Sequence, residues 1–385
     1  MRTGTLPNRI RAGVLGTGRG GYLAGLFACH EDVEIAAGCD FADAPLSAFA
    51  ARFPRAYLCK EYAELLAQDF DVLILASYCM DHGADAVRAL RAGKHVFSEV
   101  TAFHTLAEGV ALVEAVEQSG KLYTLAENFI YFRDVLEMQR VFRAGQLGEF
   151  VYGQGQYVQD IRHLMPRNPD GSFHWRAWLP PFYYGSHALA PVLQIAGARP
   201  VSVIGQSVDG KMPKCRNPID FATFVVRVEN GGLIEALVSF SASRQPLHAW
   251  FSVYGTQGQA EGDRLRIQHL TDLYVYREGM AHSESAERYR APYGLRKPYA
   301  KPGQGEGDHL MVLNFLEALR GQSKLAVDVY RACDFTLPGI LAYRSAVEGG
   351  SARQVPDWRE HSTRERYRTD GFCCPRDEAV RTEEE

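Results

Sequence analysis

Two patterns of hydrophobic and polar positions divide the chain near residue 128. In the first part, short apolar runs rich in β-forming residues cover 11–16, 33–40, 71–77, 95–100 and 121–127. Amphipathic stretches with helical spacing, such as 44–53 and 85–93, lie between these runs. Strands that alternate with helices predict a parallel, doubly wound α/β sheet. We therefore expect a first domain over residues 1–128.

The pattern changes from about residue 150, where strand-like runs follow one another directly. They cover 149–160, 200–208, 221–228, 233–242 and 249–256. The sequence ENGG between the third and fourth runs is typical of a hairpin turn, and an apolar helix over 308–320 is expected to cover one face of the sheet. These runs predict an α+β domain over 129–360 with an open, mainly antiparallel sheet. Residues 361–385 are polar and charged, which is typical of a flexible tail.

Bulk composition narrows the possible partners. A chain of 385 residues exceeds what one core usually supports, which agrees with two domains. The net charge of −4 gives no electrostatic reason to expect nucleic acid or a membrane surface as partner. The eight cysteines form no C-x-x-C motif, and neither a signal peptide nor an apolar run long enough to cross a membrane is visible. We expect a cytoplasmic, metal-free protein.

The first turn of the chain carries a dinucleotide-binding pattern. In VLGTGRGG, Gly16, Gly18 and Gly21 fit G-x-G-x-x-G directly after an apolar strand and at the start of a helix. Gly16 is expected to permit the tight turn, Gly18 to let the backbone approach a pyrophosphate, and Gly21 to let helix and strand pack closely. The helix N-terminus then offers N–H groups to the phosphates. This is the turn of a Rossmann domain.

An acidic residue at the end of the second strand indicates which cofactor is bound. Asp40 stands where a carboxylate can accept hydrogen bonds from both hydroxyls of an adenosine ribose. A carboxylate repels a 2′-phosphate, so NAD is expected rather than NADP. Arg19 lies inside the loop, is itself a candidate cofactor ligand, and would weaken this preference.

Three further motifs resemble the Gfo/Idh/MocA family, the group of glucose–fructose oxidoreductase and inositol dehydrogenase, in order over residues 10 to about 355. GKHVFSEVT resembles the family's G-K-H-V…E-K-P, ASYCMDH resembles A-T-P-N-x-x-H, and an asparagine follows the fifth strand. The resemblance implies a sugar or polyol substrate, NAD(P), and a second-domain sheet that often forms a homo-oligomer interface. It also implies cofactor contacts at Ser77, His82, Glu99 and Asn128.

The chain departs from the family's usual catalytic set in two places. The family has a lysine after the glutamate, where this chain has Val100, and an aspartate four residues before a histidine, where this chain has Tyr183. His187 occupies the histidine position. Two of the three polar groups that the family uses are therefore absent.

A narrower resemblance, to the NAD-dependent α-N-acetylgalactosaminidases of the same family, accounts for both departures. The segments EVT, AEN, GQYVQD, HWRAW and YGSHALAP match motifs of that branch in the same order. The resemblance implies functional side chains at Glu127, Tyr157 and His187. A tyrosine of the branch falls on His309, and a histidine beside the nicotinamide falls on Gln159.

The chemistry of these side chains suggests their roles. His187 has the intrinsic pKa of a base that takes a hydroxyl proton, and Tyr157 and Tyr184 can orient the oxygen or relay the proton. Glu127 can fix a sugar hydroxyl or remove a proton from carbon. The candidate substrate contacts are Trp175 as an apolar platform, Arg176 and Arg162 as ligands for a carboxylate, and His309.

Three functions remain open from the sequence. The first is an NAD-dependent oxidoreductase that acts on a sugar, polyol or glycoside. The second is a redox-assisted glycoside hydrolase or lyase that holds NAD tightly and shows no net redox change. The third is a non-catalytic relative that senses NAD or sugar, which the missing lysine and aspartate would explain.

Overall fold

The computed structural model describes residues 9–164, 174–212, 219–243, 248–264, 272–280, 287–290 and 306–374. The chain divides into two compact units, each built from three segments. The first unit comprises Met1–Asn128, Leu295–Cys333 and Asp357–Gly371, and the second comprises Phe129–Gly294, Asp334–Pro356 and Phe372–Glu385. The sequence analysis expected contiguous domains, and it contained no signal that later segments return to the first unit.

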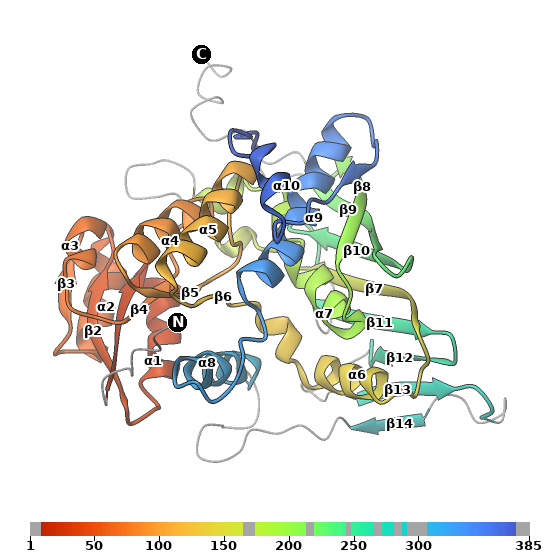
Figure 1. Ribbon diagram of the computed structural model, residues 1–385, viewed down its shortest axis with the longest axis horizontal. Helices are drawn as coiled ribbons and strands as arrows, with labels where there is room; N and C mark the ends of the chain where they lie inside the picture. The colour runs from red at the N-terminus through yellow and green to blue at the C-terminus, as the bar shows by residue number, and fades with distance from the viewer. Residues whose placement is uncertain are drawn as a thin grey trace. The chain divides into compact units, whose positions relative to one another are not determined.

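The first unit contains the predicted parallel sheet, with strands in the order β3-β2-β1-β4-β5-β6 (Figure 1). Its strands are β1 (Ile10–Leu15), β2 (Val33–Cys39), β3 (Tyr57–Cys59), β4 (Val72–Leu75), β5 (His95–Ser98) and β6 (Tyr123–Leu125). Every paired neighbour runs parallel. The order reverses direction beside β1, and such a switch point is where open α/β sheets bind ligands. The expected fold class is confirmed.

The helices of the first unit follow the apolar and polar spacing of the sequence. They are α1 (Thr17–Phe27), α2 (Asp43–Arg52), α3 (Tyr62–Leu66), α4 (His82–Arg91), α5 (Leu106–Ser119) and α8 (Glu306–Leu319). The sequence analysis expected the last of these helices to cover the second sheet, but it belongs to the first unit and contacts α1. Helix α5 shows why one of them begins and ends where it does. Thr105 and Glu108 form a reciprocal capping box at its start, and Gly120 ends it with a φ of 64°.

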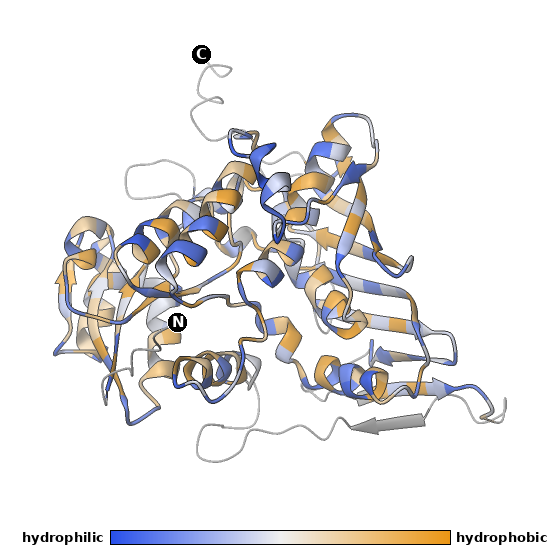
Figure 2. Cartoon of the chain, viewed as in Figure 1, coloured by the Kyte–Doolittle hydropathy of each residue, from blue (hydrophilic) through white to orange (hydrophobic). Residues whose placement is uncertain are grey.

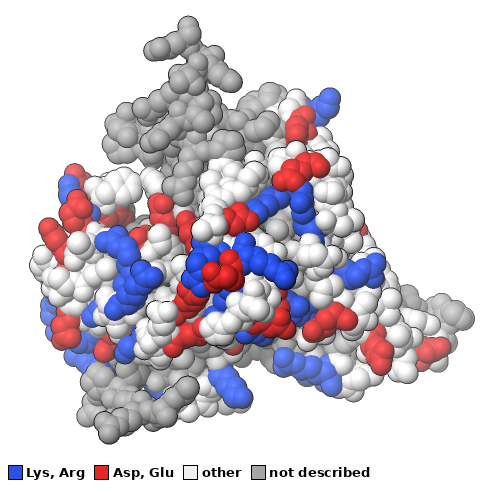
Figure 3. All heavy atoms as spheres, turned by 45° about the horizontal axis from the view of Figure 1, so that its top comes forward, with Lys and Arg blue, Asp and Glu red and all other residues white. Residues whose placement is uncertain are grey.

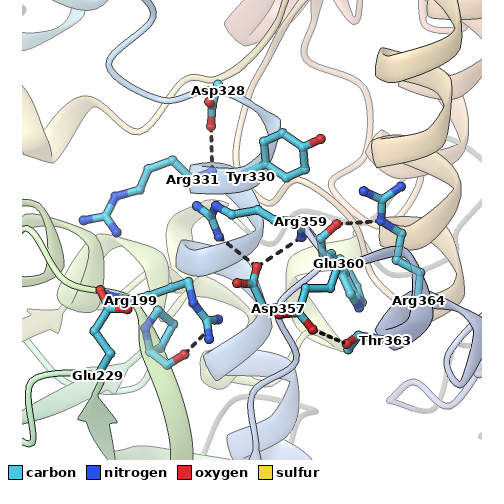
Figure 4. A network of polar contacts seen from close by, with 12 residues as sticks. Arg199, Glu229, Asp328, Tyr330, Arg331, Asp357, Arg359, Glu360, Thr363 and Arg364 are labelled. Carbon is cyan, nitrogen blue, oxygen red and sulfur yellow. Dashed lines mark hydrogen bonds and ion pairs between the residues drawn. The ribbon is translucent and has the colours of Figure 1, made fainter.

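Residues 361–371, expected to belong to a flexible tail, are folded within the first unit. Helix α10 (His361–Glu365) places Arg364 against α5, where its guanidinium donates to both carboxylate oxygens of Glu117 at 2.6 Å. Arg364 is only 1% exposed, so its positive charge is stabilised by the carboxylate of Glu117 and not by solvent. Just before α10, Asp357 accepts from the backbone N–H and the guanidinium of Arg359 (Figure 4). Residues 375–385 lie outside the described residues.

The second unit is built on a mixed, mainly antiparallel sheet, as expected. Its strand order is β14-β13-β12-β11-β7-β10-β9-β8-β15, and only β7 and β10 pair in parallel within the described residues. The bounds are β7 (Phe150–Val158), β8 (Pro200–Asp209), β9 (Ile219–Val228), β10 (Leu233–Ser239), β11 (Ala249–Gly255), β12 (Gly258–Gly262), β13 (Asp272–Arg277), β14 (Glu287–Arg290) and β15 (Arg353–Gln354). The ENGG turn joins β9 to β10 as an antiparallel pair.

One helix packs unusually closely on this sheet. Of α6 (Arg133–Arg143), α7 (Ser186–Ala196) and α9 (Val329–Val347), helix α7 contacts β7, β10 and β11. A Cβ on Gly155 of β7 would lie 1.8 Å from the carbonyl oxygen of Ala188 in α7. The absence of a side chain at Gly155 therefore lets the first turn of α7 rest directly on the strand.

Hydropathy and charge agree with two buried cores. Apolar residues follow the helix faces and strands that pack on each sheet (Figure 2). Acidic and basic side chains are interspersed over the face drawn in Figure 3. Among the described residues, no helix has both the length and the apolar character needed to span a membrane.

We predict that Gly155→Ala lowers the midpoint of thermal unfolding, because the new methyl group would force α7 away from β7. Overpacking of this kind costs about 1–3 kcal/mol. Gly371→Ala is the control, since no atom lies within 4 Å of a Cβ at that position. The two variants would be compared by calorimetry, and equal midpoints would contradict the close contact.

Candidate functional site

The glycine turn after β1 has the geometry of a phosphate-binding turn. Gly16 has a φ of 83°, and a Cβ there would lie 2.2 Å from the carbonyl oxygen of Ala76, so only glycine fits. A Cβ on Gly18 would meet nothing within 4 Å. The backbone at Gly18 is therefore open on the side where a side chain would otherwise stand, next to the N–H groups of the first turn of α1.

The third glycine of the motif does not have the role that the sequence suggested. A Cβ on Gly21 would make only an ordinary contact, 3.5 Å from Phe49. A Cβ on Gly20 would lie 2.7 Å from Cγ1 of Val14 in β1. The close approach of helix to strand therefore depends on Gly20, one residue earlier than the motif indicates.

Asp40 lies at the end of β2 and faces the start of α1. Its Oδ2 accepts from the backbone N–H of Thr17 at 2.7 Å and from the Thr17 hydroxyl at 3.0 Å, and its Oδ1 accepts from the N–H of Ala42 at 3.0 Å. A carboxylate offers about four acceptor sites, so one remains for a ribose hydroxyl. The same carboxylate also satisfies an N–H at the start of α1, a function that the sequence analysis did not predict.

Arg19 of the turn is held by two carboxylates rather than left free. Its Nε donates to Glu99 at the end of β5 at 2.7 Å, and its Nη2 donates to Asp308 in the first turn of α8 at 3.2 Å. The guanidinium side chain is still 41% exposed. Because two acids neutralise it, Arg19 adds little net positive charge to attract a 2′-phosphate.

Asp308 connects several of the predicted cofactor residues and was missed as a functional candidate. Besides Arg19, it accepts from the amide of Asn128 at 3.0 Å and from the hydroxyl of Tyr22 at 3.1 Å. Burial and the charge of Asp308 raise the pKa of Tyr22 to about 12, so this phenol stays a donor. The sequence assigned Asp308 only to a helix start, and no local signal brings it to the turn. Its neighbour His309 is half-buried, and burial lowers its pKa.

Ser77 and His82 stabilise the loops at the ends of β4 and β5. The two ring nitrogens of His82 each lie 3.0 Å from a backbone carbonyl oxygen, that of Thr101 for Nδ1 and that of Ser77 for Nε2. The Ser77 hydroxyl donates to Asp85 at 3.0 Å. His82 is 1% exposed. These contacts hold the His82 ring between the loops that follow β4 and β5, and its predicted contact with the cofactor stays a prediction.

Glu127 is also inaccessible. Its side chain is fully buried, at 0% exposure, directly after β6. The catalytic role that the resemblance implies for Glu127 stays a prediction from the sequence.

In the second unit, the first turn of α7 and the end of β7 form a cluster of aromatic rings. The His187 ring centroid lies 4.5 Å from that of Phe129, 4.9 Å from that of Tyr157 and 5.3 Å from that of Tyr184. The Tyr157 hydroxyl donates to Oε1 of Gln159 at 2.6 Å. The structure thus brings together the predicted residues His187, Tyr157 and Tyr184.

A second imidazole lies at the same cluster and was not predicted. The His248 ring is 5.3 Å from Tyr157 and 5.8 Å from Phe129, edge to face in both cases. The backbone carbonyl of His248 accepts from the N–H of Val158, which places it beside the end of β7. Only the pairing of β11 with β7 reveals this proximity, and a single sequence does not specify which strands pair.

The predicted substrate platform joins the cluster through Tyr184. In the 3-10 helix η3 (Trp175–Ala177), the Trp175 ring lies 6.2 Å from Tyr184, and the guanidinium carbon of Arg176 lies 4.3 Å from the centre of the Trp175 ring. Arg162 begins the 3-10 helix η2 (Arg162–Leu164), but its side chain lies outside the described residues.

Tyr183, which stands at the family's aspartate position, has a structural role. It is 3% exposed, and its hydroxyl oxygen accepts from the backbone N–H of Cys374. Burial raises its pKa well above the usual value. Tyr183 therefore does not replace the aspartate as an acid or base near neutral pH.

The residues of the first unit fit a dinucleotide. Gly18 leaves an open approach to the N–H groups of α1, and Asp40 stands at the end of β2 with acceptor capacity. Arg19 follows β1, on the same side of the switch point as Asp40, whereas Glu99 and Asn128 follow β5 and β6 on the other side. A nicotinamide dinucleotide matches this set of donors and acceptors.

Comparisons with known proteins agree with this geometry. Residues 10–127 match the model of the family described as the oxidoreductase family with an NAD-binding Rossmann fold, Gfo/Idh/MocA. Residues 217–368 match the C-terminal domain of glycosyl hydrolase 109. The two matches lie in different parts of the chain, one in the predicted Rossmann domain and one toward the C-terminus.

Individual relatives are similar over most of their length. A glycosyl hydrolase family 109 protein of Solibacter usitatus (strain Ellin6076) is 26% identical over 91% of this chain and 89% of its own. A glycosyl hydrolase family 109 protein of Shewanella sp. (strain W3-18-1) is 24% identical over 91% of this chain and 85% of its own length. Among solved structures, levoglucosan dehydrogenase with NADH and levoglucosan has a TM-score of 0.76 at 18% identity, over 90% of this chain and 100% of its own. An Agrobacterium radiobacter oxidoreductase in complex with NAD+, L-tartaric acid and magnesium has a TM-score of 0.74 at 17% identity. The match covers 90% of this chain and 98% of that protein. At such identities the structural likeness shows the fold.

We predict that Asp40→Asn raises the ratio of NADP to NAD affinity by about tenfold, because it removes the charge that repels a 2′-phosphate. Asp43→Asn removes a nearby carboxylate whose side chain is 83% exposed, and it should leave the ratio unchanged. Titration calorimetry with both dinucleotides measures the ratio. If the ratio is the same in both variants, Asp40 does not select the cofactor.

Proposed function

We propose that this protein is an NAD-dependent oxidoreductase that acts on a hydroxyl group of a sugar, polyol or glycoside. The observation that carries the proposal is the cluster of His187, Tyr157 and Tyr184 at the start of α7, in a chain whose first unit has a dinucleotide-binding turn. The names of the relatives, which include glycosyl hydrolases and a levoglucosan dehydrogenase, support a carbohydrate substrate. The charge of Asp40 supports NAD over NADP.

His187 is the group on this chain best suited to accept the proton of the substrate hydroxyl. When bound, NAD supplies a hydride acceptor at its nicotinamide ring. Val100 cannot exchange a proton, and Glu127 is fully buried. His187 is 7% exposed and lies against the aromatic rings of Phe129 and Tyr157, which hold the imidazole in place. An imidazole nitrogen can accept a proton and suits general-base catalysis.

Tyr157 orients the oxygen of the substrate or relays its proton. Its phenol is fixed by the hydrogen bond that its hydroxyl donates to Oε1 of Gln159. The ring centroid of Tyr184 lies 5.3 Å from that of His187 and 6.4 Å from that of Tyr157, and Tyr184 also contacts the Trp175 platform.

A second candidate function is a redox-assisted glycoside hydrolase or lyase without net redox change. The match of residues 217–368 to the C-terminal domain of glycosyl hydrolase 109 favours it. Incubation with a panel of aryl glycosides distinguishes the two. Release of phenol without accumulation of NADH would identify the glycosidase, whereas stoichiometric NADH from free sugars would identify the dehydrogenase. A rise in melting temperature with NAD, but no turnover of any sugar, would instead indicate a sensing protein.

We further propose that the chain forms a homo-oligomer through the outer face of its second sheet. Ile204 and Val208 of β8 and Val225 of β9 project from that face, and each is more than a third exposed. Exposed apolar patches of this kind often mark interfaces. Sedimentation of a monomer at micromolar concentration would contradict this assembly. The cytoplasmic location stays a prediction from the sequence.

We predict that His187→Ala lowers kcat at least about a hundredfold, the scale of a general base, and changes the Kd of NAD little. His361→Ala, which removes a histidine whose side chain is 80% exposed, is the control. Steady-state kinetics on the best substrate of the panel and calorimetry with NAD give the two readouts. Near-normal turnover of His187→Ala would remove His187 from the mechanism.

A further inference from the structure

The side chain of Arg176 is fixed on an aromatic ring beside the His187 cluster. Its guanidinium carbon lies 4.3 Å from the centre of the Trp175 ring, and the residue is half-buried. The backbone N–H of Arg176 donates to Nδ1 of His174 at 3.3 Å, which fixes the first turn of η3. A cation stacked on an indole loses little entropy when it binds a ligand, because its orientation is already set.

The charge of Arg176 has no acidic partner within the described part of the chain. No described carboxylate lies within ion-pair distance of its guanidinium, in contrast to Arg19, Arg320 and Arg364, which each contact an aspartate or glutamate. Burial and the positive charge of Arg176 lower the pKa of His174 to about 4, so His174 is neutral at pH 7. The platform therefore carries one positive charge.

The platform is continuous with the residues proposed for catalysis. The Trp175 ring lies 6.2 Å from that of Tyr184, and the Tyr184 ring lies 5.3 Å from that of His187. The Tyr184 ring therefore contacts both the indole that holds the Arg176 guanidinium and the imidazole of His187. The N–H groups at the edge of the guanidinium plane stay available, because the indole covers only one face.

We propose that Arg176 binds the carboxylate of a sugar acid, so that the substrate is a uronate or an aldonate rather than a neutral sugar. This inference rests on the proposed function. The planar guanidinium matches a planar carboxylate through two parallel hydrogen bonds. A phosphate monoester carries nearly two negative charges at pH 7, and the platform offers one cation, so the geometry favours a carboxylate.

Calorimetry on the full chain saturated with NAD tests the proposal. The ligands are D-glucuronate, D-galacturonate and D-gluconate, each paired with its neutral amide. At least one acid is expected to bind about tenfold or more tightly than its amide, the scale of a charge-assisted hydrogen bond. Arg176→Gln should remove this preference, and Arg176→Lys should restore only part of it. Arg359→Gln, which removes an arginine stacked on Tyr330 in the first unit, is the control and should keep the preference.

Several results would overturn the proposal. Equal affinity for acid and amide would do so, as would a preference that survives in Arg176→Gln, or binding of glucose 6-phosphate without binding of any sugar acid. Failure of the proposed function is distinguishable, because it appears as absent NAD binding or as no NADH formed from any sugar. If neutral sugars are oxidised while no sugar acid binds, the function stands and the role of Arg176 is wrong.

Discussion

The direct contact between α7 and β7 is the constraint on which the rest of the second unit depends. Gly155 provides no side chain, so the carbonyl of Ala188 rests against the strand. That approach brings the imidazole of His187, at the preceding position of the helix, against the ring of Tyr157 at the end of the same strand. A helix held a few ångströms further away would separate the two rings, and no cluster of titratable groups would form.

The charged groups around the glycine turn of the first unit are paired with one another or with backbone N–H groups. Arg19, Glu99 and Asp308 form a closed network at the carboxyl edge of the sheet, in which the acids hold the guanidinium and the guanidinium neutralises the acids. Asp40 is likewise engaged with the start of α1. Such groups position a ligand through fixed hydrogen bonds. The imidazole of His187, which we propose as the base, lies in the second unit instead.

A feature of this structure could be predicted from the sequence where it depends on residues close together along the chain. The strands, the glycine turn, Asp40 and the ENGG hairpin depend on neighbours in sequence, and the pattern of residues predicts them. Asp308 reaches Arg19 across 289 positions, and His248 reaches Tyr157 only through strand pairing, so no local pattern indicates either contact. The motif predicted that Gly21 allows α1 to pack closely on β1. In the structure this glycine is Gly20, which faces Val14, because the rotation of α1 on β1 depends on the packed core.

The position that lacks a lysine has a physical explanation in these contacts. The residue after Glu99 is Val100, whose apolar side chain carries no charge. It is 3% exposed and packs in the core. The cation that pairs with Glu99 is Arg19, which comes from the phosphate-binding turn. A guanidinium stays protonated at any physiological pH, so it balances the charge of Glu99 but cannot take a proton from a substrate. Glu99 therefore has an electrostatic partner at this edge, but that partner cannot act as a base. The reaction proposed above takes its base from another element, and among the residues assembled in the second unit we propose the imidazole of His187 for that role.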